Sequence, residues 1–343
     1  MDTQIITNPS EQELNMLASA LRNGELVSIP TETVYGLGAN GLDPEAMDKI
    51  YAAKGRPSDN PLILHVPNSE SIKPLVTEVS KTAQLLMDTF WPGPLTITLP
   101  KSDLVPDRAT GGLPRVALRC PDHKVCRALL ERAGVPVAAP SANISGRPSP
   151  TTAQDVYHDM KGRISYILDA GPCTIGVEST VVEVHDDKVI ILRPGGITKA
   201  QLETVVSTVE YDTALVNATT KPKAPGMKYT HYAPDAPMTV VVGNPEVIAS
   251  TFKELSEGIE GPIGCLVSHE TYDLIKDDIR FMCHCFGHHG DALALGHDFY
   301  KSLLHFNENH VTLILAEGVN DDGFGVAIMN RMEKASGHHI IYK

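Results

Sequence analysis

The stretch DPEAMDKIYAAKGRPSDNPLILHV (43–66) contains one helix, one stiff turn and one strand, and it decides the class of the fold. Asp43 is a typical helix-capping residue, and the proline after it suits the first helical turn. Apolar residues then recur at helical spacing as far as Lys54, and Gly55 is suited to end the helix. The apolar run 61–66 beyond the turn predicts a buried strand. A helix followed by a buried strand is typical of α/β proteins.

This alternation of helices and strands continues on both sides of the stretch. A capping box at Ser10 and Glu13 opens a helix that carries leucines on one face. Further apolar segments predict a hairpin at 179–194 and single strands at 25–30, 94–99, 115–120, 136–140 and 165–170. We therefore expect a mixed α/β domain over residues 1–212.

The composition changes after this first domain. Residues 213–237 are rich in Thr, Pro, Ala and Lys and show no periodicity, which is typical of a linker. The apolar segments 238–243, 262–268 and 311–318 then predict buried strands with helices between them. Residues 238–343 are therefore expected to form a second, smaller α/β domain.

Charge and composition exclude several classes of protein. A formal net charge of −13 over 343 residues argues against a broad nucleic-acid surface, since phosphate binding needs a basic face. The apolar runs are too short to cross a bilayer, and the first residues do not resemble a secretory signal. Six unevenly spaced cysteines suggest reduced thiols rather than a disulfide framework. We expect a cytoplasmic protein with no membrane contact.

Basic residues gather where strands end or where elements join. Arg115 and Arg119 are four residues apart, so on a strand they point to the same side. The loop PSANISGRPSP (140–150) places small hydroxyl and amide groups beside glycine, which suits a close approach to phosphate. Each cation alone is more often a solvated surface charge. Together they favour a nucleotide phosphate pocket without a P-loop, at the carboxyl ends of strands, and the set is Lys54, Arg56, Arg115, Arg119, Arg147 and Arg193.

Two further motifs are weaker. GLGANG (36–41) matches the glycine pattern of dinucleotide-binding folds, but PTETVY separates it from the preceding strand, so a glycine-rich loop is the better interpretation. CHCFGHH (283–289) suggests a metal site, yet the spacing of its ligands differs from that of structural zinc sites. Structural thiols and exposed imidazoles are the better interpretation there. A lone histidine inside an apolar strand, such as His65, is also more often structural than catalytic.

The turn KGRPSDNPL (54–62), together with PSANISG (140–146), resembles the K-x-R…S-x-N signature of the YrdC family. The resemblance continues in order and spacing through PTETVYGLGA (30–39), WPGPLT (91–96), RVALRCPDH (115–123), GVESTVV (176–182) and LRPGGI (192–197). The segments MKYTHYAP (227–234) and FGVAIMNRMEKAS (324–336) are similar to the long, two-domain form of the threonylcarbamoyl-AMP synthases. The resemblance covers nearly the whole chain.

The resemblance implies a nucleotidyltransferase that joins L-threonine, bicarbonate and ATP into L-threonylcarbamoyl-AMP and releases pyrophosphate. A separate threonylcarbamoyl transferase machinery would then carry the threonylcarbamoyl group to tRNA, forming threonylcarbamoyladenosine beside the anticodon. The implied fold is a YrdC-type twisted mixed sheet with a basic concavity, followed by a smaller Rossmann-like α/β domain. Mg²⁺ is expected to arrive with ATP, held mainly by the phosphates.

Such a reaction needs positioning and charge neutralisation more than a covalent nucleophile. Lys54 and Arg56 match the signature, and the resemblance implies that they stabilise charge on the phosphoryl group. The implied ATP contacts are Arg56, Asn60, Arg115, Ser141, Asn143, Ser149, Arg193 and, from the linker, Tyr232. The implied L-threonine contacts are Thr33, His65, Arg119, Ala139 and Ser179. Among these, Arg119 could pair with the threonine carboxylate and His65 has the titration range of a base.

Two other classes of function stay open. A double-stranded RNA-binding module of the YrdC fold would use the basic concavity, but the chain is acidic and lacks a basic and aromatic stacking pattern. A zinc-dependent structural or regulatory protein would depend on the cysteines and histidines near residue 283 alone. The second domain could act as a lid over the pocket or as a docking surface for a partner.

Overall fold

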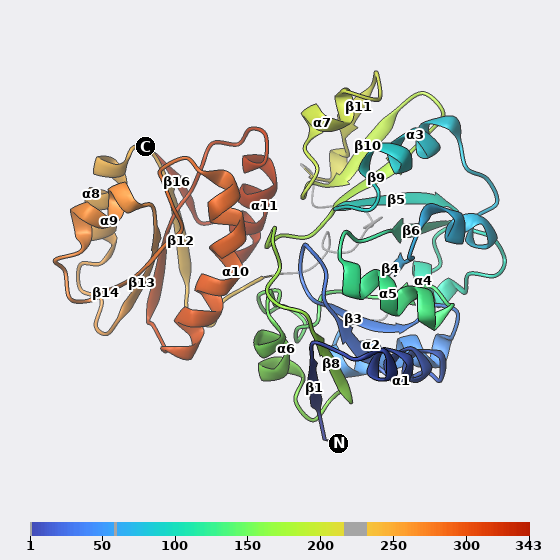
Figure 1. Ribbon diagram of the computed structural model, residues 1–343. Coiled ribbons are helices and arrows are strands. Elements are labelled where there is room, and N and C mark those ends of the chain that lie inside the picture. Colours follow the sequence, from blue (N-terminus) through green and yellow to red (C-terminus); the bar gives the residue numbers. More distant parts are fainter. Residues whose placement is uncertain (1, 58–59, 216–231) are drawn as a thin grey trace. The chain divides into compact units, whose positions relative to one another are not determined.

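The computed structural model describes residues 2–57, 60–215 and 232–343, and it divides into two compact units (Figure 1). The first unit contains the described residues of Met1–Ser145, Ser149–Thr174 and Glu178–Tyr229. The second unit contains Gly146–Pro148, Ile175–Val177 and the described residues of Thr230–Lys343. Most of the expected linker lies outside the described residues, so the domain boundaries at 212 and 237 stay a prediction.

An 11-stranded mixed sheet organises the first unit. Parallel neighbours such as β5 and β9 occur beside antiparallel neighbours such as β5 and β6. From edge to edge the strands are β1 (Gln4–Thr7), β8 (Tyr166–Asp169), β2 (Val27–Ile29), β3 (Gly36–Asn40), β7 (Val137–Ala138), β4 (Ile63–His65), β6 (Arg115–Arg119), β5 (Leu95–Pro100), β9 (Thr180–Val184), β10 (Val189–Arg193) and β11 (Val209–Tyr211).

The helices of the first unit begin and end where their capping residues predict. Asp43 accepts a hydrogen bond from the backbone N–H of Glu45, and Gly55 closes the same helix in the left-handed conformation with φ of 62°. The capping box of Ser10 and Glu13 is also formed. The helices are α1 (Glu11–Arg22), α2 (Pro44–Lys54), α3 (Lys81–Phe90), α4 (Asp107–Thr110), α5 (Lys124–Ala133), α6 (Ala153–Met160) and α7 (Lys199–Glu203), with 3₁₀ turns at Ser69–Leu75 and Thr213–Leu215.

The two faces of the central strands differ in what they contact. In β4 and β6, Leu64 and Leu118 belong to the main hydrophobic core of the first unit. Ile63 and Ala117 instead belong to a small apolar cluster on the opposite face. Because side chains alternate along a strand, the residues two positions further on share that second face. Polar side chains of these strands therefore lie on the side away from the main core.

A five-stranded, entirely parallel sheet organises the second unit. Its order is β14 (Phe281–Cys285), β13 (Ile263–Val267), β15 (Leu313–Glu317), β12 (Met238–Val242) and β16 (Ile340–Tyr342). In Figure 1, α8 (Pro245–Leu255) and α9 (His269–Ile275) cover one face, and α10 (Ala292–Glu308) and α11 (Gly325–Ala335) cover the other. The predicted class, a large mixed sheet followed by a smaller α/β domain, is confirmed. The strand order is 3-2-4-1-5 in chain order, which differs from the 3-2-1-4-5 order of dinucleotide-binding sheets.

Two further features concern the chain as a whole. None of the helices among the described residues is both long and apolar enough to cross a membrane. All six cysteines are free thiols, and four of them are buried.

Candidate active site

Neighbouring strands of the large sheet bring polar side chains to one edge of the sheet, which is the edge formed by the carboxyl ends of β4 and β6. β4 and β6 are parallel, and their register pairs His65 with Arg119 at the last residue of each strand. β5 starts at this edge because it runs antiparallel to β6, and β9 starts beside it, with Ser179 immediately before its first residue. β10 is antiparallel to β9 and ends here at Arg193. Four predicted residues from four separate motifs therefore gather at one sheet edge.

Lys54, the last residue of α2, joins the two halves of the signature. Its Nζ donates to the carbonyl oxygen of Ser141 at 2.5 Å and to that of Asn143 at 2.6 Å, and it lies 3.3 Å from Asn143 Oδ1. The side chain is only 3% exposed, and burial, with Arg56 nearby, holds the pKa of Lys54 well below its usual range. Three oxygen acceptors match the three N–H donors of an ammonium group. The predicted closeness of these motifs is therefore seen as direct contact.

Asn60 lies in the turn KGRPSDNPL (54–62) and has a buried side-chain amide. It is 1% exposed, and neither Nδ2 nor Oδ1 has a hydrogen-bond partner among the described residues. Buried amide groups nearly always have partners, so a ligand that supplies both a donor and an acceptor fits here. Arg56 lies in the same turn and donates from Nη2 to the carbonyl oxygen of Pro61 at 3.3 Å. Residues 58–59 of the signature lie outside the described residues.

Arg119 is held by three groups of the protein. Its Nη1 donates to Thr33 Oγ1 at 2.9 Å and its Nε to the carbonyl oxygen of Gly93 at 3.3 Å. Its Nη2 lies 2.7 Å from Glu32 Oε1, and both side chains are buried. A guanidinium has five N–H groups, so Nη1 and Nη2 each keep a second N–H for another acceptor. Glu32 was not among the predicted site residues, although it stands in the TETVYG segment between two threonines.

His65 lies in an environment that keeps its ring neutral. Its Nδ1 lies 3.2 Å from the carbonyl oxygen of Ile63. Burial, together with the positive charge of Arg119, lowers the pKa of His65 to about 3. An imidazole with such a low pKa accepts protons poorly at neutral pH. The geometry therefore argues against His65 as a general base and favours a hydrogen-bonding role.

Ser179 and Arg193 form a second buried group at the edge. Arg193 donates from Nη2 and Nε to the carbonyl oxygen of Ser179, at 2.8 and 3.2 Å. The hydroxyl of Ser179 lies 2.8 Å from that of Thr96, which the sequence analysis did not select. Ser149, on a different segment, donates to Glu178 Oε1 at 2.7 Å. Glu178 was also missed, although it precedes Ser179 in the GVESTVV motif.

Arg115 shares a strand with Arg119 but lies at the opposite end of it. Four residue steps of about 3.3 Å separate the two backbones by roughly 13 Å. Arg115 donates from Nη2 to the carbonyl oxygens of Thr98 and Val184, at 2.7 and 2.8 Å. Partial burial lowers the pKa of Arg115. Its role at the site stays a prediction.

Two other predicted residues have a clear local setting. The backbone N–H of Ala139 donates to the carbonyl oxygen of Ile63 at 3.0 Å, so the backbone group left for a ligand is its carbonyl. Tyr232 belongs to the second unit and has a positive φ of 68°. Its ring lies 5.3 Å from that of Tyr300 and 5.8 Å from the guanidinium of Arg331. Residues 227–231 of the MKYTHYAP segment lie outside the described residues.

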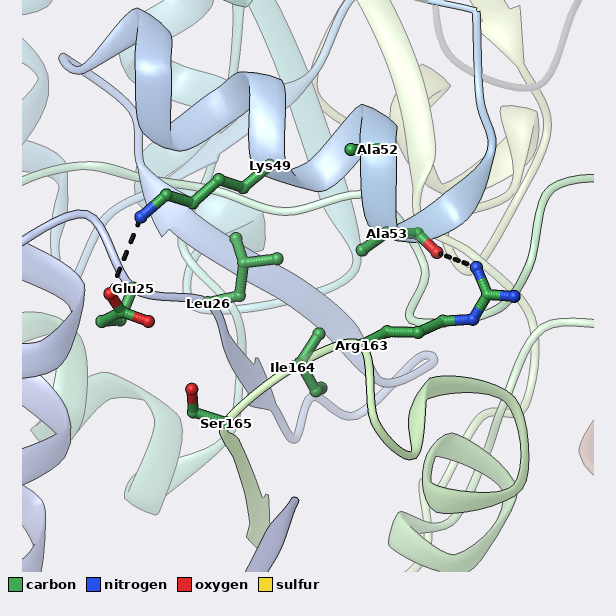
Figure 2. A pocket seen from close by; sticks show the side chains of 8 residues that line it. All are labelled: Glu25, Leu26, Lys49, Ala52, Ala53, Arg163, Ile164 and Ser165. Carbon is green, nitrogen blue, oxygen red and sulfur yellow. Dashed lines mark hydrogen bonds and ion pairs between the residues drawn. The ribbon is translucent and has the colours of Figure 1, made fainter. Parts of the chain in front are cut away.

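A separate cavity of about 420 Å³ opens elsewhere in the first unit (Figure 2). Lys49 points across it toward Glu25, with 3.7 Å between the charged atoms. Arg163 donates from Nη1 to the carbonyl oxygen of Ala53 at 3.0 Å. This cavity contains none of the predicted site residues. It touches the site indirectly, because Ala53 precedes Lys54 in the last turn of α2.

The donors available to a metal ion are limited. Among the described residues, no group of three or more His, Cys, Asp or Glu side chains could hold a metal ion. In the segment CHCFGHH, each histidine instead has its own carboxylate neighbour. His284 lies beside Asp298, His288 beside Glu270, and His289 beside Glu317.

Comparison with known proteins matches both units. A family model described as "Telomere recombination" covers residues 19–195, and one described as "Threonylcarbamoyl-AMP synthase, C-terminal domain" covers residues 197–337. The "Threonylcarbamoyl-AMP synthase" of Bacillus subtilis is 46% identical, over 97% of this chain and 95% of the relative. That of Pyrococcus abyssi is 43% identical, over 96% of both chains.

A solved structure supports the same relationship. The structure titled "Crystal structure of P. abyssi Sua5 complexed with L-threonine" superposes with a TM-score of 0.90 at 41% identity, over 99% of this chain and 100% of that one. The predicted family and enzyme class are thereby confirmed, with both predicted domains represented. The signature contact between Lys54 and Ser141 and the full-length matches lead to one conclusion: the chain belongs to the threonylcarbamoyl-AMP synthase family.

Proposed function

We propose that the chain converts L-threonine, bicarbonate and ATP into L-threonylcarbamoyl-AMP and pyrophosphate at the edge of the large sheet. The observation that carries this proposal is the contact of Lys54 with Ser141 and Asn143. It fixes a buried cation and two polar backbone groups beside a turn that bears Arg56. A phosphoryl-transfer site needs positive charge that is fixed in position more than it needs a nucleophile.

The reaction proceeds in two chemical steps. The neutral amine of threonine attacks the carbon of bicarbonate, or of the carbon dioxide in equilibrium with it, and a carbamate forms. With bicarbonate a C–O bond breaks and one water leaves, and with carbon dioxide one proton passes from the nitrogen to the solvent. An oxygen of the resulting carbamate then attacks the α-phosphorus of ATP, and the bond to the β-phosphate oxygen breaks. Pyrophosphate leaves with the electron pair of that bond.

The ATP contacts are proposed on both sides of this phosphorus. Lys54 and Arg56 stabilise the charge that develops on the phosphoryl oxygens and on pyrophosphate. The amide of Asn60 supplies a donor and an acceptor that have no protein partner among the described residues. The further proposed contacts are Arg115, Ser141, Asn143, Ser149, Arg193 and Tyr232.

The L-threonine contacts are proposed at Thr33, His65, Arg119, Ala139 and Ser179. The second N–H groups of Arg119 Nη1 and Nη2 suit a bidentate contact with the substrate carboxylate. Neutral His65 and the hydroxyls of Thr33 and Ser179 provide hydrogen bonds without adding charge. The backbone carbonyl of Ala139 is an acceptor for the amine.

Mg²⁺ is proposed to enter with ATP as part of the substrate. Glu32 and Glu178 are engaged by Arg119 and Ser149, so neither is a ready metal ligand. This donor set fits a magnesium ion held mainly by phosphate oxygens and water. When bound there, the ion neutralises charge on the phosphates.

The family to which the chain belongs is the basis for placing the product in a tRNA modification route. Threonylcarbamoyl-AMP is a mixed anhydride and is therefore activated for acyl transfer, and a separate transferase would pass its acyl group to adenosine beside the tRNA anticodon. Contact with tRNA is then indirect, and the cytoplasm, where ATP and tRNA meet, is the proposed location. Direct binding of double-stranded RNA is disfavoured, because Lys54, Arg119 and Arg193 are 3–5% exposed and could not reach an RNA backbone.

Product formation tests the proposal directly. Purified full-length protein is incubated with ATP, labelled bicarbonate and L-threonine, and labelled threonylcarbamoyl-AMP and pyrophosphate are measured. We expect both products in equal amounts, and neither without L-threonine. Absence of both products from protein that is folded by circular dichroism would refute the function.

A further inference from the structure

A small cavity of about 200 Å³ lies at the carboxyl edge of the parallel sheet in the second unit. Its lining includes Gly243 after β12, Gly318 and Asn320 after β15, and Tyr342 in β16. His289, from the loop that follows β14, also lines the cavity. The synthase reaction proposed above uses none of these residues.

The cavity lies at the point where the direction of the chain connections reverses. From β12 the chain passes through α8 toward β13, whereas from β15 it passes through α11 toward β16 on the other side of the sheet. β12 and β15 are neighbours, so the loops that leave them diverge and open a crevice between them. Ligands of open α/β sheets bind in crevices at such switch points.

The imidazole of His289, which lines the cavity, contacts a buried acid that lies outside the lining. Glu317, the last residue of β15, is fully buried. Its Oε2 accepts hydrogen bonds from the backbone N–H and the hydroxyl of Ser268, both at 2.9 Å. Its Oε1 lies 2.6 Å from His289 Nδ1, and the His289 side chain is 35% exposed. With Nδ1 turned to Glu317, the other ring nitrogen, Nε2, is left for a ligand.

Contacts with Glu270 fix the loop that carries His289. Glu270 accepts a hydrogen bond from the backbone N–H of His289 at 2.9 Å and lies 3.0 Å from His288 Nδ1. Hydrogen bonds from its own backbone N–H, from His288 and from the backbone of His289 lower the pKa of Glu270 to about 2. The loop is flanked by Gly287 and Gly290, which have φ of 145° and 80°, a region that favours glycine. The imidazole of His289 is therefore held in place, as binding sites require.

We propose that this cavity binds a small oxyanion of the phosphate or carboxylate class. His289 Nε2 donates to such an anion when the ring is protonated, with Nδ1–H directed at Glu317. Lys343 and Asn320, a basic and an amide residue, also belong to the lining. A volume of about 200 Å³ is below the ~300 Å³ at which pockets for drug-sized ligands begin, so a nucleotide is too large.

Nuclear magnetic resonance of the full-length, ¹⁵N-labelled chain tests the proposal. Gly290 and Gly318 line the cavity, so their backbone amide signals report on binding there. Potassium phosphate and potassium acetate are titrated separately, each against potassium chloride at matched ionic strength. We expect saturable shifts of both signals with one or both oxyanions and none with chloride. The signal of Gly258, beyond the far end of α8, should not move.

Two histidine substitutions, one inside the cavity lining and one outside it, separate the site from a general salt effect. His289→Gln should weaken binding ~10-fold or more, since a hydrogen bond to a charged group is lost. His305→Gln, which changes an exposed histidine of α10 outside the cavity lining, should keep the affinity within ~2-fold. A shift with phosphate alone assigns the phosphate class, and one with acetate alone the carboxylate class. Shifts reproduced by chloride, no saturable shift at all, or full binding in His289→Gln would each overturn the proposal.

Because these readouts lie in the second unit, they are independent of the synthase function. A chain that bound phosphate here but made no threonylcarbamoyl-AMP would keep this site and lose the proposed reaction. A chain that made the product but showed no shift at Gly290 and Gly318 would keep the reaction and lose this site.

Discussion

Lys54 Nζ lies 2.5 Å from the carbonyl oxygen of Ser141, so the two halves of the signature meet although 87 residues separate them in sequence. The lysine is brought there by the last turn of α2, and the serine by the loop that follows β7. A second short contact, to the carbonyl oxygen of Asn143, makes the ammonium a bridge between two segments. The same group therefore has a structural task and a proposed catalytic one.

The first prediction separates these two tasks. Lys54→Met removes the charge near the triphosphate and leaves two buried carbonyl oxygens without their donor. We expect turnover to fall ~100-fold or more, as for other electrostatic stabilisers. We also expect a loss of about 1–3 kcal/mol in the free energy of unfolding, from the unsatisfied acceptors. Steady-state kinetics at saturating ATP and urea unfolding measure the two effects.

Lys49→Met is the matched control for this change. Lys49 lies in the same helix, but its side chain is 49% exposed. It pairs with Glu25 at 3.7 Å and donates to the carbonyl oxygen of Gly24 at 2.7 Å. Loss of these two contacts should cost about 1–2 kcal/mol without a change in turnover. If Lys54→Met kept near-normal turnover, the triphosphate would have to lie elsewhere.

The second prediction concerns the buried pair of Arg119 and Glu32. Glu32→Gln leaves the Arg119 guanidinium without its charged partner in a site where both residues are almost fully buried. Breaking a buried ion pair in this way typically costs about 3–5 kcal/mol, so the free energy of unfolding should fall by about that amount. KM for L-threonine should rise more than KM for ATP, since Arg119 is the proposed carboxylate ligand. A loss below 1 kcal/mol, with both KM values unchanged, would contradict this role.

The sequence and the structure agree best where the signal is local. Asp43 and Gly55 bracket α2, and Ser10 with Glu13 opens α1, because caps depend on residues only a few positions apart. The signature and its neighbouring motifs were found by resemblance, and the sheet register then gathered them at one edge. Arg115 was harder to judge, because a four-residue spacing predicts a shared face but not which end of the strand is used.

Sequence reasoning missed what depends on distant partners. Glu32 looks like an ordinary strand-end acid until Arg119, 87 positions later, is placed against it. The 11-stranded order could not be predicted, since β1 pairs with β8 across more than 150 residues. His65 has the titration range of a base in isolation, and only the fold shows its burial beside Arg119, which lowers its pKa. Burial and pairing are properties of the fold, which a single sequence does not display.

The third prediction follows from the low pKa of His65. Burial and Arg119 lower it from 6.5 to about 3, so between these values the unfolded chain binds a proton that the folded chain does not. Stability must then rise with pH across this window and be lost as the pH falls. From pH 7 to pH 5 the histidine alone should cost about 2 kcal/mol in the free energy of unfolding.

His65→Gln tests this assignment, because glutamine keeps hydrogen-bonding capacity and cannot titrate. The variant should lose about 2 kcal/mol less than the parent chain between pH 7 and pH 5, measured by urea unfolding at each pH. Equal losses in the two proteins would mean that folding does not lower the pKa of His65. In that case His65 could act as a general base at neutral pH.

The fourth prediction concerns Arg163, which lines the cavity of Figure 2 and donates to the carbonyl oxygen of Ala53 at 3.0 Å. We infer that it positions the last turn of α2, and so Lys54, without touching substrate. Arg163→Met should raise KM for ATP ~3- to 10-fold, with kcat changed less, as expected from the loss of one charge-assisted hydrogen bond. Arg163→Lys, which can still donate, should recover most of the loss. Lys49→Met changes another side chain of the same cavity and should leave KM for ATP unchanged, so an equal effect of both substitutions would assign the change to the cavity and not to the Ala53 contact.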